Sequence, residues 1–285
     1  MTVTNFYFDA NGIRLHALVH GERARKPPLV FLHGFMDHAH AWDRVIAQLQ
    51  EEYWCVALDF RGFGDSGWHP HGTYAFAEYQ LDVACLLRAL DLSRAIFVGH
   101  SMGGNIATQY AAVFPEQVER LILVEGFGPP QRTADEFPER TARWVRRLLD
   151  GRREHPRVMA TLAEVAARLQ ETNPHMIDEL ADYIAGHAVR RQGEGYVWKF
   201  DPCHRLPAPH PYTPDDFIPF WKRLTVPTLS LHGGSGPFTV EALQERYQHF
   251  GRLQTDVIDD AAHGIHVEQP EALDRRIRQF VGEGK

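Results

Sequence analysis

The sequence predicts an α/β protein with a mostly parallel β-sheet, flanked by helices and interrupted by a mainly helical insertion. Two observations support this prediction. Short apolar runs of strand length alternate with stretches of helical spacing up to residue 124, and strands that alternate with helices form parallel sheets. The alternation then stops after Glu125 and returns at Thr228, which indicates a separate inserted segment.

The composition is that of an ordinary globular protein. Of the 285 residues, 44% are hydrophobic and 24% are charged, which excludes extensive disorder. No apolar run approaches the roughly 20 residues of a membrane helix, and the N-terminus lacks the pattern of a secretory signal. The formal charge of −7 gives no basic footprint for nucleic acid. Three widely separated cysteines fit a reducing compartment, so we expect a cytoplasmic protein that binds neither nucleic acid nor membrane.

The first half of the chain predicts a hairpin followed by repeated strand and helix units. Asn11-Gly12 joins the two hairpin strands, Asn5–Phe8 and Ile13–His20, because this dipeptide favours the tight turn between antiparallel strands. Short apolar runs predict further strands at Leu29–Leu32, Trp54–Leu58, Ala95–Val98 and Leu121–Val124. Helical spacing predicts helices at Ala41–Gln50, Tyr74–Leu90 and Met102–Phe114.

The second half predicts the insertion and the end of the core. Residues 129–221 are expected to be helical or loop-like, and residues 1–128 and 222–285 to form the core. Helices in the insertion are predicted at Thr141–Asp150, with an apolar side of Trp144, Val145, Leu148 and Leu149, and at Val158–Gln170 and Met176–Val189. The core is expected to end with strands Thr228–Leu231 and Leu253–Ile258 and helices Glu241–Phe250 and Glu271–Val281.

The segment Gly99-His100-Ser101-Met102-Gly103 matches the pattern G-x-S-x-G between a predicted strand and a predicted helix. This is the setting of a nucleophile elbow, in which a serine is held on a strained turn. The residues around the serine must be small so that the strand and the helix can approach each other. Ser101 is therefore the candidate nucleophile.

With these residues the sequence resembles the α/β-hydrolase superfamily over nearly the whole chain. The other matching segments are Phe31-Leu32-His33-Gly34-Phe35, Asp59-Phe60-Arg61-Gly62-Phe63-Gly64-Asp65-Ser66-Gly67 and Ala262-His263-Gly264-Ile265-His266-Val267-Glu268-Gln269-Pro270. The resemblance implies that residues 129–221 form a helical cap and that the chemistry is acyl transfer through a covalent acyl-serine. It also implies that Asp65-Ser66 belongs to a structural turn rather than to a catalytic pair.

The resemblance also assigns the base and the oxyanion hole. A serine hydroxyl needs an adjacent base, and His263 lies in the loop after the last predicted strand, where the family has its base. His266 is the competitor in the same loop. The oxyanion donors are expected to be the backbone N–H groups of Met102 and Phe35, with His33 and Gly34 shaping the loop.

The acid of the catalytic triad departs from the usual family pattern. Gly236 occupies the position after Thr228–Leu231 at which an aspartate is expected. Glu125, at the end of the strand before the insertion, is our candidate instead, and its position resembles that of the acid in many haloalkane dehalogenases. The alternatives are a capping role for Glu125, an acid role for Asp256, Asp259 or Asp260, or a Ser-His dyad that works without an acid.

We therefore expect a serine carboxylesterase that cleaves an ester or similar acyl bond of a small, apolar substrate. Two alternatives stay open: an inactive ligand-binding member of the fold, and a C–C hydrolase or lyase with the same residues. No cofactor is expected, and no metal at the closely spaced pairs His38/His40 and His69/His71. The candidate pocket residues are Met36, Phe127, Trp144, Trp198, Phe217, Trp221 and Phe238.

Overall fold

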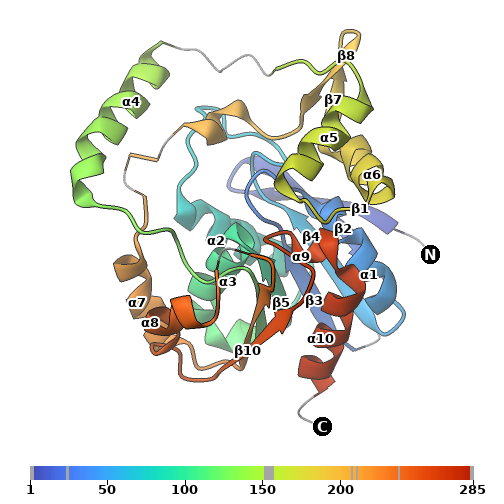
Figure 1. The fold of residues 1–285 in the computed structure, drawn as a ribbon, viewed down its shortest axis with the longest axis vertical. Coiled ribbons are helices and arrows are strands. Elements are labelled where there is room, and N and C mark those ends of the chain that lie inside the picture. Colours follow the sequence, from blue (N-terminus) through green and yellow to red (C-terminus); the bar gives the residue numbers. More distant parts are fainter. Residues whose placement is uncertain are drawn as a thin grey trace.

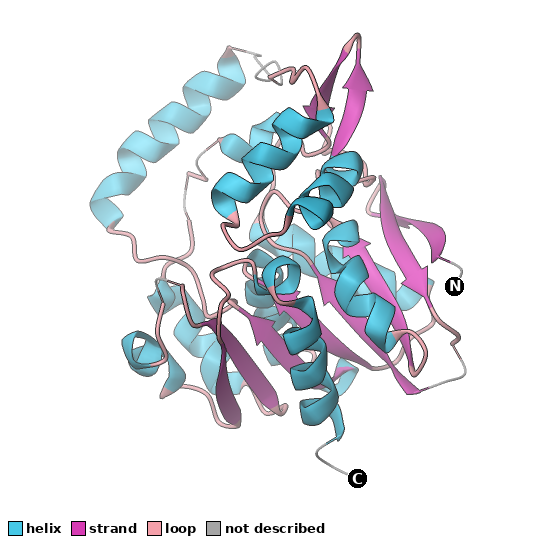
Figure 2. Cartoon of the chain, turned by 45° about the vertical axis from the view of Figure 1, so that its right-hand side comes forward, coloured by secondary structure: helices cyan, strands magenta, loops and turns pink. Residues whose placement is uncertain are grey.

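An eight-stranded sheet runs through the molecule between two groups of helices (Figures 1 and 2). The structure is a computed structural model that describes residues 3–23, 26–150, 157–206, 208–209, 211–236 and 238–282. The strand order is β1-β2-β4-β3-β5-β6-β9-β10. The pairs β1/β2 and β2/β4 are antiparallel and the other pairs are parallel, so the predicted fold class is confirmed.

The elements of the core follow the predicted order. The strands are β1 (Val3–Ala10), β2 (Ile13–His20), β3 (Lys26–Leu32), β4 (Tyr53–Asp59), β5 (Ala95–His100), β6 (Val118–Val124), β9 (Thr228–Gly233) and β10 (Leu253–Ile258). The helices are α1 (Asp43–Leu49), α2 (Phe76–Ala89), α3 (Met102–Val113), α7 (Pro214–Arg223), α8 (Gln244–Tyr247), α9 (Ile265–Glu268) and α10 (Pro270–Gly282). Asn11 and Gly12 both have positive φ in the first hairpin turn, as their types predict.

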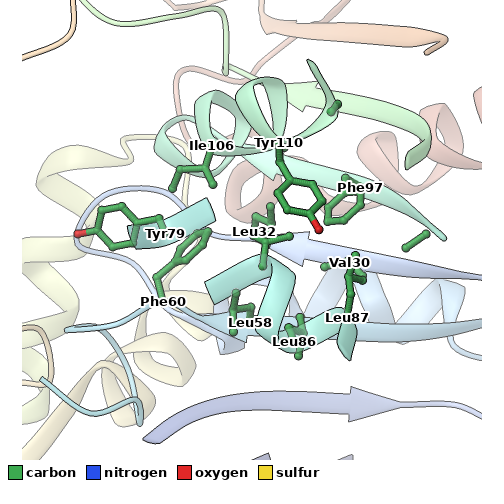
Figure 3. Close-up of a cluster of buried hydrophobic side chains, with 14 of the residues drawn as sticks. Val30, Leu32, Leu58, Phe60, Tyr79, Leu86, Leu87, Phe97, Ile106 and Tyr110 are labelled. Carbon is green, nitrogen blue, oxygen red and sulfur yellow. The ribbon is translucent and has the colours of Figure 1, made fainter. Parts of the chain in front are cut away.

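Hydrophobic side chains cover both faces of the sheet. Along β3, Val30 and Leu32 belong to the cluster on the side of α2, α3 and α7, whereas Leu29 and Phe31 belong to the cluster on the side of α1 and α10. Successive side chains of a strand point to opposite faces, so a strand covered on both faces is apolar throughout. Figure 3 shows the first cluster between α2, α3 and the strands, with Leu58, Phe60, Tyr79, Phe97, Ile106 and Tyr110 among its members.

The insertion contains a β-hairpin that the helical prediction missed. Strands β7 (Val189–Gln192) and β8 (Gly195–Trp198) pair with each other and form a separate two-stranded sheet. Gly193 adopts a φ of 60° in the turn, a conformation that favours glycine. The prediction of helix or loop was wrong here because it did not use this turn signal or the strand-forming residues after it.

Three helices complete the insertion: α4 (Phe137–Leu149), α5 (Leu162–Thr172) and α6 (Asp178–Ala188). Helix α5 begins four residues later than predicted because the Thr161 hydroxyl accepts the backbone N–H of Glu164 and caps the helix there. Helices α5 and α6 pack against each other around a small apolar cluster. Helix α4 has no buried residue, and Leu149 is 80% exposed, so its predicted apolar side is not packed as expected.

The end of the predicted insertion packs with the core. Phe217 and Trp221 of α7 are buried in the same cluster as Ile106 of α3. Helix α7 therefore lies against α3, although its sequence falls within residues 129–221. Among the described residues, none of the helices combines the length and apolar character needed to cross a bilayer.

Candidate active site

The candidate residues meet at one edge of the sheet. Parallel strands β3, β5, β6, β9 and β10 end there, and the carboxyl ends of such strands are where binding sites form in open α/β sheets. Ser101 follows β5, Glu125 follows β6 and His263 follows β10. The loop after β3 carries Phe35 to the same edge.

Ser101 is held on a strained turn. Its φ of 47° and ψ of −111° lie outside the regions that non-glycine residues normally adopt. The turn is tight because a Cβ atom on Gly103 would collide with the Leu32 carbonyl, and one on Gly99 would lie 2.6 Å from the Gly104 nitrogen. The helix α3 begins directly after the serine, as expected for a nucleophile elbow.

Glu125 and His263 form a pair through the imidazole Nδ1. Oε2 of Glu125 lies 3.1 Å from Nδ1 of His263, and Oε1 accepts the backbone N–H of Gly233 at 2.9 Å. The Glu125 side chain is buried, whereas that of His263 is 45% exposed. A carboxylate accepts hydrogen bonds, so Nδ1 carries the proton in this pair and Nε2 is left with its lone pair.

No hydrogen bond joins Ser101 Oγ to His263 in the described part of the chain. The two residues are nevertheless neighbours, because His100 donates from Nε2 to the His263 carbonyl oxygen at 2.9 Å. The rings of His100 and His263 are 4.9 Å apart. Serine–histidine contacts are often long in unliganded enzymes and tighten in the substrate complex.

Two backbone N–H groups are available near Ser101. Met102 is the first residue of α3, where a helix leaves its N–H groups without an internal acceptor. Phe35 lies in the loop after β3, and Gly34 before it packs so closely on His100 that a Cβ atom would lie 2.5 Å from the ring. His33 is buried and fixes this loop, with Nδ1 bonded to the Gly34 carbonyl and Nε2 accepting the Phe60 N–H. Within the described residues neither the Met102 nor the Phe35 N–H has an acceptor.

A cavity of about 1050 Å³ opens beside Ser101. Of the predicted pocket residues, Met36, Trp144 and Phe217 line it, together with Phe35 and Met102. Further aromatic residues of its wall are Tyr74, Phe76, Tyr79 and Tyr212.

Four of the predicted pocket residues do not line this cavity. Trp221 is packed between Phe217 and Phe250, and Trp198 stacks on Phe200. Phe127 packs against Phe238, their ring centroids 4.8 Å apart. Trp198, Trp221 and Phe127 pack against other aromatic rings, and spacing along the chain could not show which way their side chains point.

His204 lines the cavity and was missed by the sequence analysis. Its ring stacks on Phe63, with the ring centroids 3.9 Å apart, and packs in a tilted arrangement against Tyr74, with the centroids 3.8 Å apart. Burial lowers the pKa of His204 to about 3, so the ring is neutral. No motif surrounds it, and only the path of the insertion brings it to the cavity.

The competing candidates are occupied by other contacts. His266 is buried and bonds Asp37 through Nε2 at 2.9 Å. The Ser66 hydroxyl donates to the Asp59 carbonyl oxygen and accepts the His16 N–H, as expected of a structural turn. Asp256 is paired with Arg276, and the structure gives His263 no contact with Asp259 or Asp260 among the described residues.

Comparison with known proteins agrees with this geometry. The profile of the alpha/beta hydrolase fold family matches residues 27–270. The chain belongs to the α/β-hydrolase family. It is 30% identical to an esterase of Mycobacterium tuberculosis over 261 residues, which cover 88% of this chain and 82% of that one. It is 25% identical to epoxide hydrolase 3 of Xenopus tropicalis, over 96% of this chain and 76% of the relative.

A solved structure shares the fold of this α/β-hydrolase. The thioesterase domain from the curacin biosynthetic pathway superposes with a TM-score of 0.89 at 22% identity, over 98% of this chain and all of that one. In the present hydrolase the loop after β9 has Gly236, which donates its N–H to the Gly233 carbonyl at 3.0 Å and supplies no carboxylate.

Proposed function

We propose that this hydrolase is a serine carboxylesterase. The observation that carries the proposal is the strained serine, Ser101, next to the hydrogen-bonded pair of Glu125 and His263. The similarity to the mycobacterial esterase supports it.

The proposed reaction has two halves. Ser101 Oγ attacks the ester carbonyl while His263 Nε2 takes its proton, and the backbone N–H groups of Phe35 and Met102 stabilise the oxyanion. His263 then gives the proton to the leaving alcohol. Water, activated by the same histidine, releases the acid from the acyl-serine. Glu125 holds the imidazole in the required tautomer and stabilises the imidazolium.

The cavity supports an apolar acyl group as substrate. Its volume of about 1050 Å³ is at the large end of the range for small-molecule sites. Several aromatic side chains belong to its wall, so an aliphatic or aromatic acyl chain would replace water against this apolar surface.

Epoxide hydrolysis, suggested by the name of one relative, is disfavoured by the nucleophile. That chemistry uses a carboxylate that attacks the epoxide carbon. Position 101 is a serine in this chain, and Glu125 is occupied by His263 and Gly233.

A fluorophosphonate probe and a panel of p-nitrophenyl esters test the proposal. We expect wild-type protein to be labelled at Ser101 and to hydrolyse at least one ester, and Ser101→Ala to lose both properties. Absence of labelling in folded wild-type protein would favour the ligand-binding alternative. Labelling without turnover of any ester or thioester would favour a C–C hydrolase or lyase.

A further inference from the structure

Three potential metal ligands lie together next to the candidate active site. They are Asp37 from the loop after β3, His100 at the end of β5 and His266 in α9. One ligand atom of each lies within 4.8 Å of the other two. The rings of His100 and His266 are 4.2 Å apart, and Nε2 of His266 is 2.9 Å from Asp37 Oδ2.

Both histidines have a buried nitrogen without a partner. Nδ1 of His100 and Nδ1 of His266 are shielded from solvent, and neither has a hydrogen-bond partner in the described part of the chain. The two residues are only 6% and 2% exposed. A buried polar atom without a partner is destabilising, so an ion bound to Nδ1 of His100 would satisfy that atom. His266 would offer its other nitrogen, Nε2, which faces Asp37.

The protonation of His100 suits a metal ligand. Its Nε2 faces the carbonyl oxygen of His263, which accepts hydrogen bonds only, so the proton is on Nε2 and Nδ1 has a free lone pair. Histidines that bind metals commonly donate their second N–H to a carbonyl in this way. Burial also lowers the pKa of His100 well below its usual value, which keeps the ring neutral.

We propose that Asp37, His100 and His266 bind a divalent transition metal ion of the zinc type, and that the bound ion inhibits the hydrolase. Two imidazoles and one carboxylate are a ligand set that such ions accept, with water in the fourth position. Asp37 is 21% exposed and provides the side from which the ion and its water enter. In a tetrahedral zinc site with bonds of about 2.0–2.2 Å, two neighbouring ligand atoms are about 3.3 Å apart. The distance between Asp37 Oδ2 and His266 Nε2, now 2.9 Å, would therefore increase by only a few tenths of an ångström.

Among the described residues a second three-residue group lies within metal-binding reach, but both ring nitrogens of its histidine already have hydrogen-bond partners. It consists of His16, Asp59 and Asp65. The Asp59 carboxylate accepts the N–H groups of Ala39 and Asp65 as well as a hydrogen bond from His16. The pairs His38/His40 and His69/His71 are in neither group.

Inhibition would follow from the contact between His100 and the catalytic loop, and this part rests on the proposed function. His100 precedes Ser101 in the chain and holds the His263 carbonyl. A metal that fixes His100 restricts the side chain that holds the His263 carbonyl, and His266 lies three residues after His263 in the chain. The serine and the imidazole then cannot adjust to the substrate.

Direct metal binding tests the site without relying on activity. Chelator-treated full-length protein is titrated with Zn²⁺ by calorimetry, and with Co²⁺ by its visible absorption. We expect one ion per chain at this site, with affinity at least tenfold weaker in His266→Gln and Asp37→Asn. The control is His71→Gln, which changes an exposed histidine outside the group. Its affinity for Zn²⁺ should be within twofold of that of the wild type.

Two further measurements decide where the ion binds. Circular dichroism and melting temperature show whether each variant is folded, and crystals soaked in Zn²⁺ should give an anomalous peak between Asp37, His100 and His266. Binding that survives His266→Gln and Asp37→Asn but is lost in His263→Ala would overturn the proposal, because the ion would then lie on the catalytic pair. Absence of binding by folded wild-type protein would overturn it as well.

Activity tests the inhibitory part. Zn²⁺ should inhibit ester hydrolysis by wild type and by His71→Gln, and His266→Gln should need at least tenfold more Zn²⁺ for the same inhibition. Unchanged hydrolysis at saturating Zn²⁺ would refute inhibition while leaving the binding site in place. If no ester is hydrolysed at all, the proposed function fails, and the binding titrations still decide the metal site.

Discussion

Nδ1 of His263 lies 3.1 Å from Oε2 of Glu125, a residue 138 positions earlier in the chain. The second carboxylate oxygen of Glu125 accepts the N–H of Gly233, at the end of β9. The strand after which the family usually has its acid therefore anchors the carboxylate of Glu125. The carboxylate is buried and held at both oxygens, which fixes its direction toward the imidazole.

Glu125→Gln is expected to lower kcat for a p-nitrophenyl ester by about 10²–10⁴. The amide can donate a hydrogen bond to Nδ1 and so favour the wrong imidazole tautomer. Steady-state kinetics measure the effect. Asp256→Asn is the control, because Asp256 pairs with Arg276, and its kcat should stay within about twofold of the wild-type value. A loss below tenfold in Glu125→Gln would reduce Glu125 to a structural role.

Gly236→Asp in the Glu125→Gln background is expected to recover part of the lost activity. The nearest atom to a Cβ on Gly236 is the Gly233 carbonyl oxygen at 3.1 Å, and the other neighbours are 3.8 Å or more away, so the side chain can be accommodated with a small shift. The kcat of the double variant is compared with that of Glu125→Gln/Gly236→Asn, which has the same size without the charge. Equal values for the two would show that the loop cannot direct a carboxylate to His263.

Trp144→Ala is expected to raise KM for esters with long acyl chains several-fold, with little change in melting temperature. Trp144 lines the cavity, but its helix α4 has no buried residue. Trp198→Ala is the matched change, because Trp198 stacks on Phe200 and does not line the cavity. It should lower the melting temperature and leave the chain-length preference unchanged. The opposite pattern would contradict the assignment of the pocket wall.

His38 is expected to make the fold sensitive to mild acid. Burial lowers the pKa of His38 to about 4, against the charges of Asp37 and Asp59, which raise it. Between pH 6.5 and 4 the unfolded chain binds a proton at this residue that the folded chain excludes, so stability is lost as the pH falls through this window. Between pH 7.5 and 5 the loss is about 2 kcal/mol for this residue alone.

His38→Phe should remove this part of the pH dependence. Urea unfolding at pH 7.5 and pH 5 measures it, and the difference in free energy of unfolding between the two pH values should shrink by about 2 kcal/mol. The same replacement at the exposed His71 serves as the control and should leave the difference unchanged. An unchanged difference in His38→Phe would show that His38 takes up a proton in the folded state.

The central strands of the core were predictable because they are apolar on both faces. Runs such as Ala95–Val98, followed by Gly99 and Ser101, identify a buried strand and its turn from local sequence alone. The position of Glu125 at the end of another such run was visible for the same reason. Its contact with His263 needed the family resemblance, since strand order cannot be obtained from periodicity.

The insertion and the metal-ligand group were less predictable. The hairpin of β7 and β8 is only two four-residue strands, too short for a periodic signal. Trp198 and Trp221 do not line the cavity, and their orientation could not be predicted because it depends on how the insertion folds back. Asp37, His100 and His266 come from three distant segments, so no spacing pattern marks them.

The exposure of helix α4 has a consequence for directed evolution of this enzyme. Arg140 and Trp144 face the cavity from a helix that contributes nothing to the hydrophobic core. A library that randomises these positions can change which acyl groups are accepted while most of its members stay folded. At Gly103, in contrast, even an alanine would meet the Leu32 carbonyl, so libraries that include the elbow glycines would consist largely of misfolded protein.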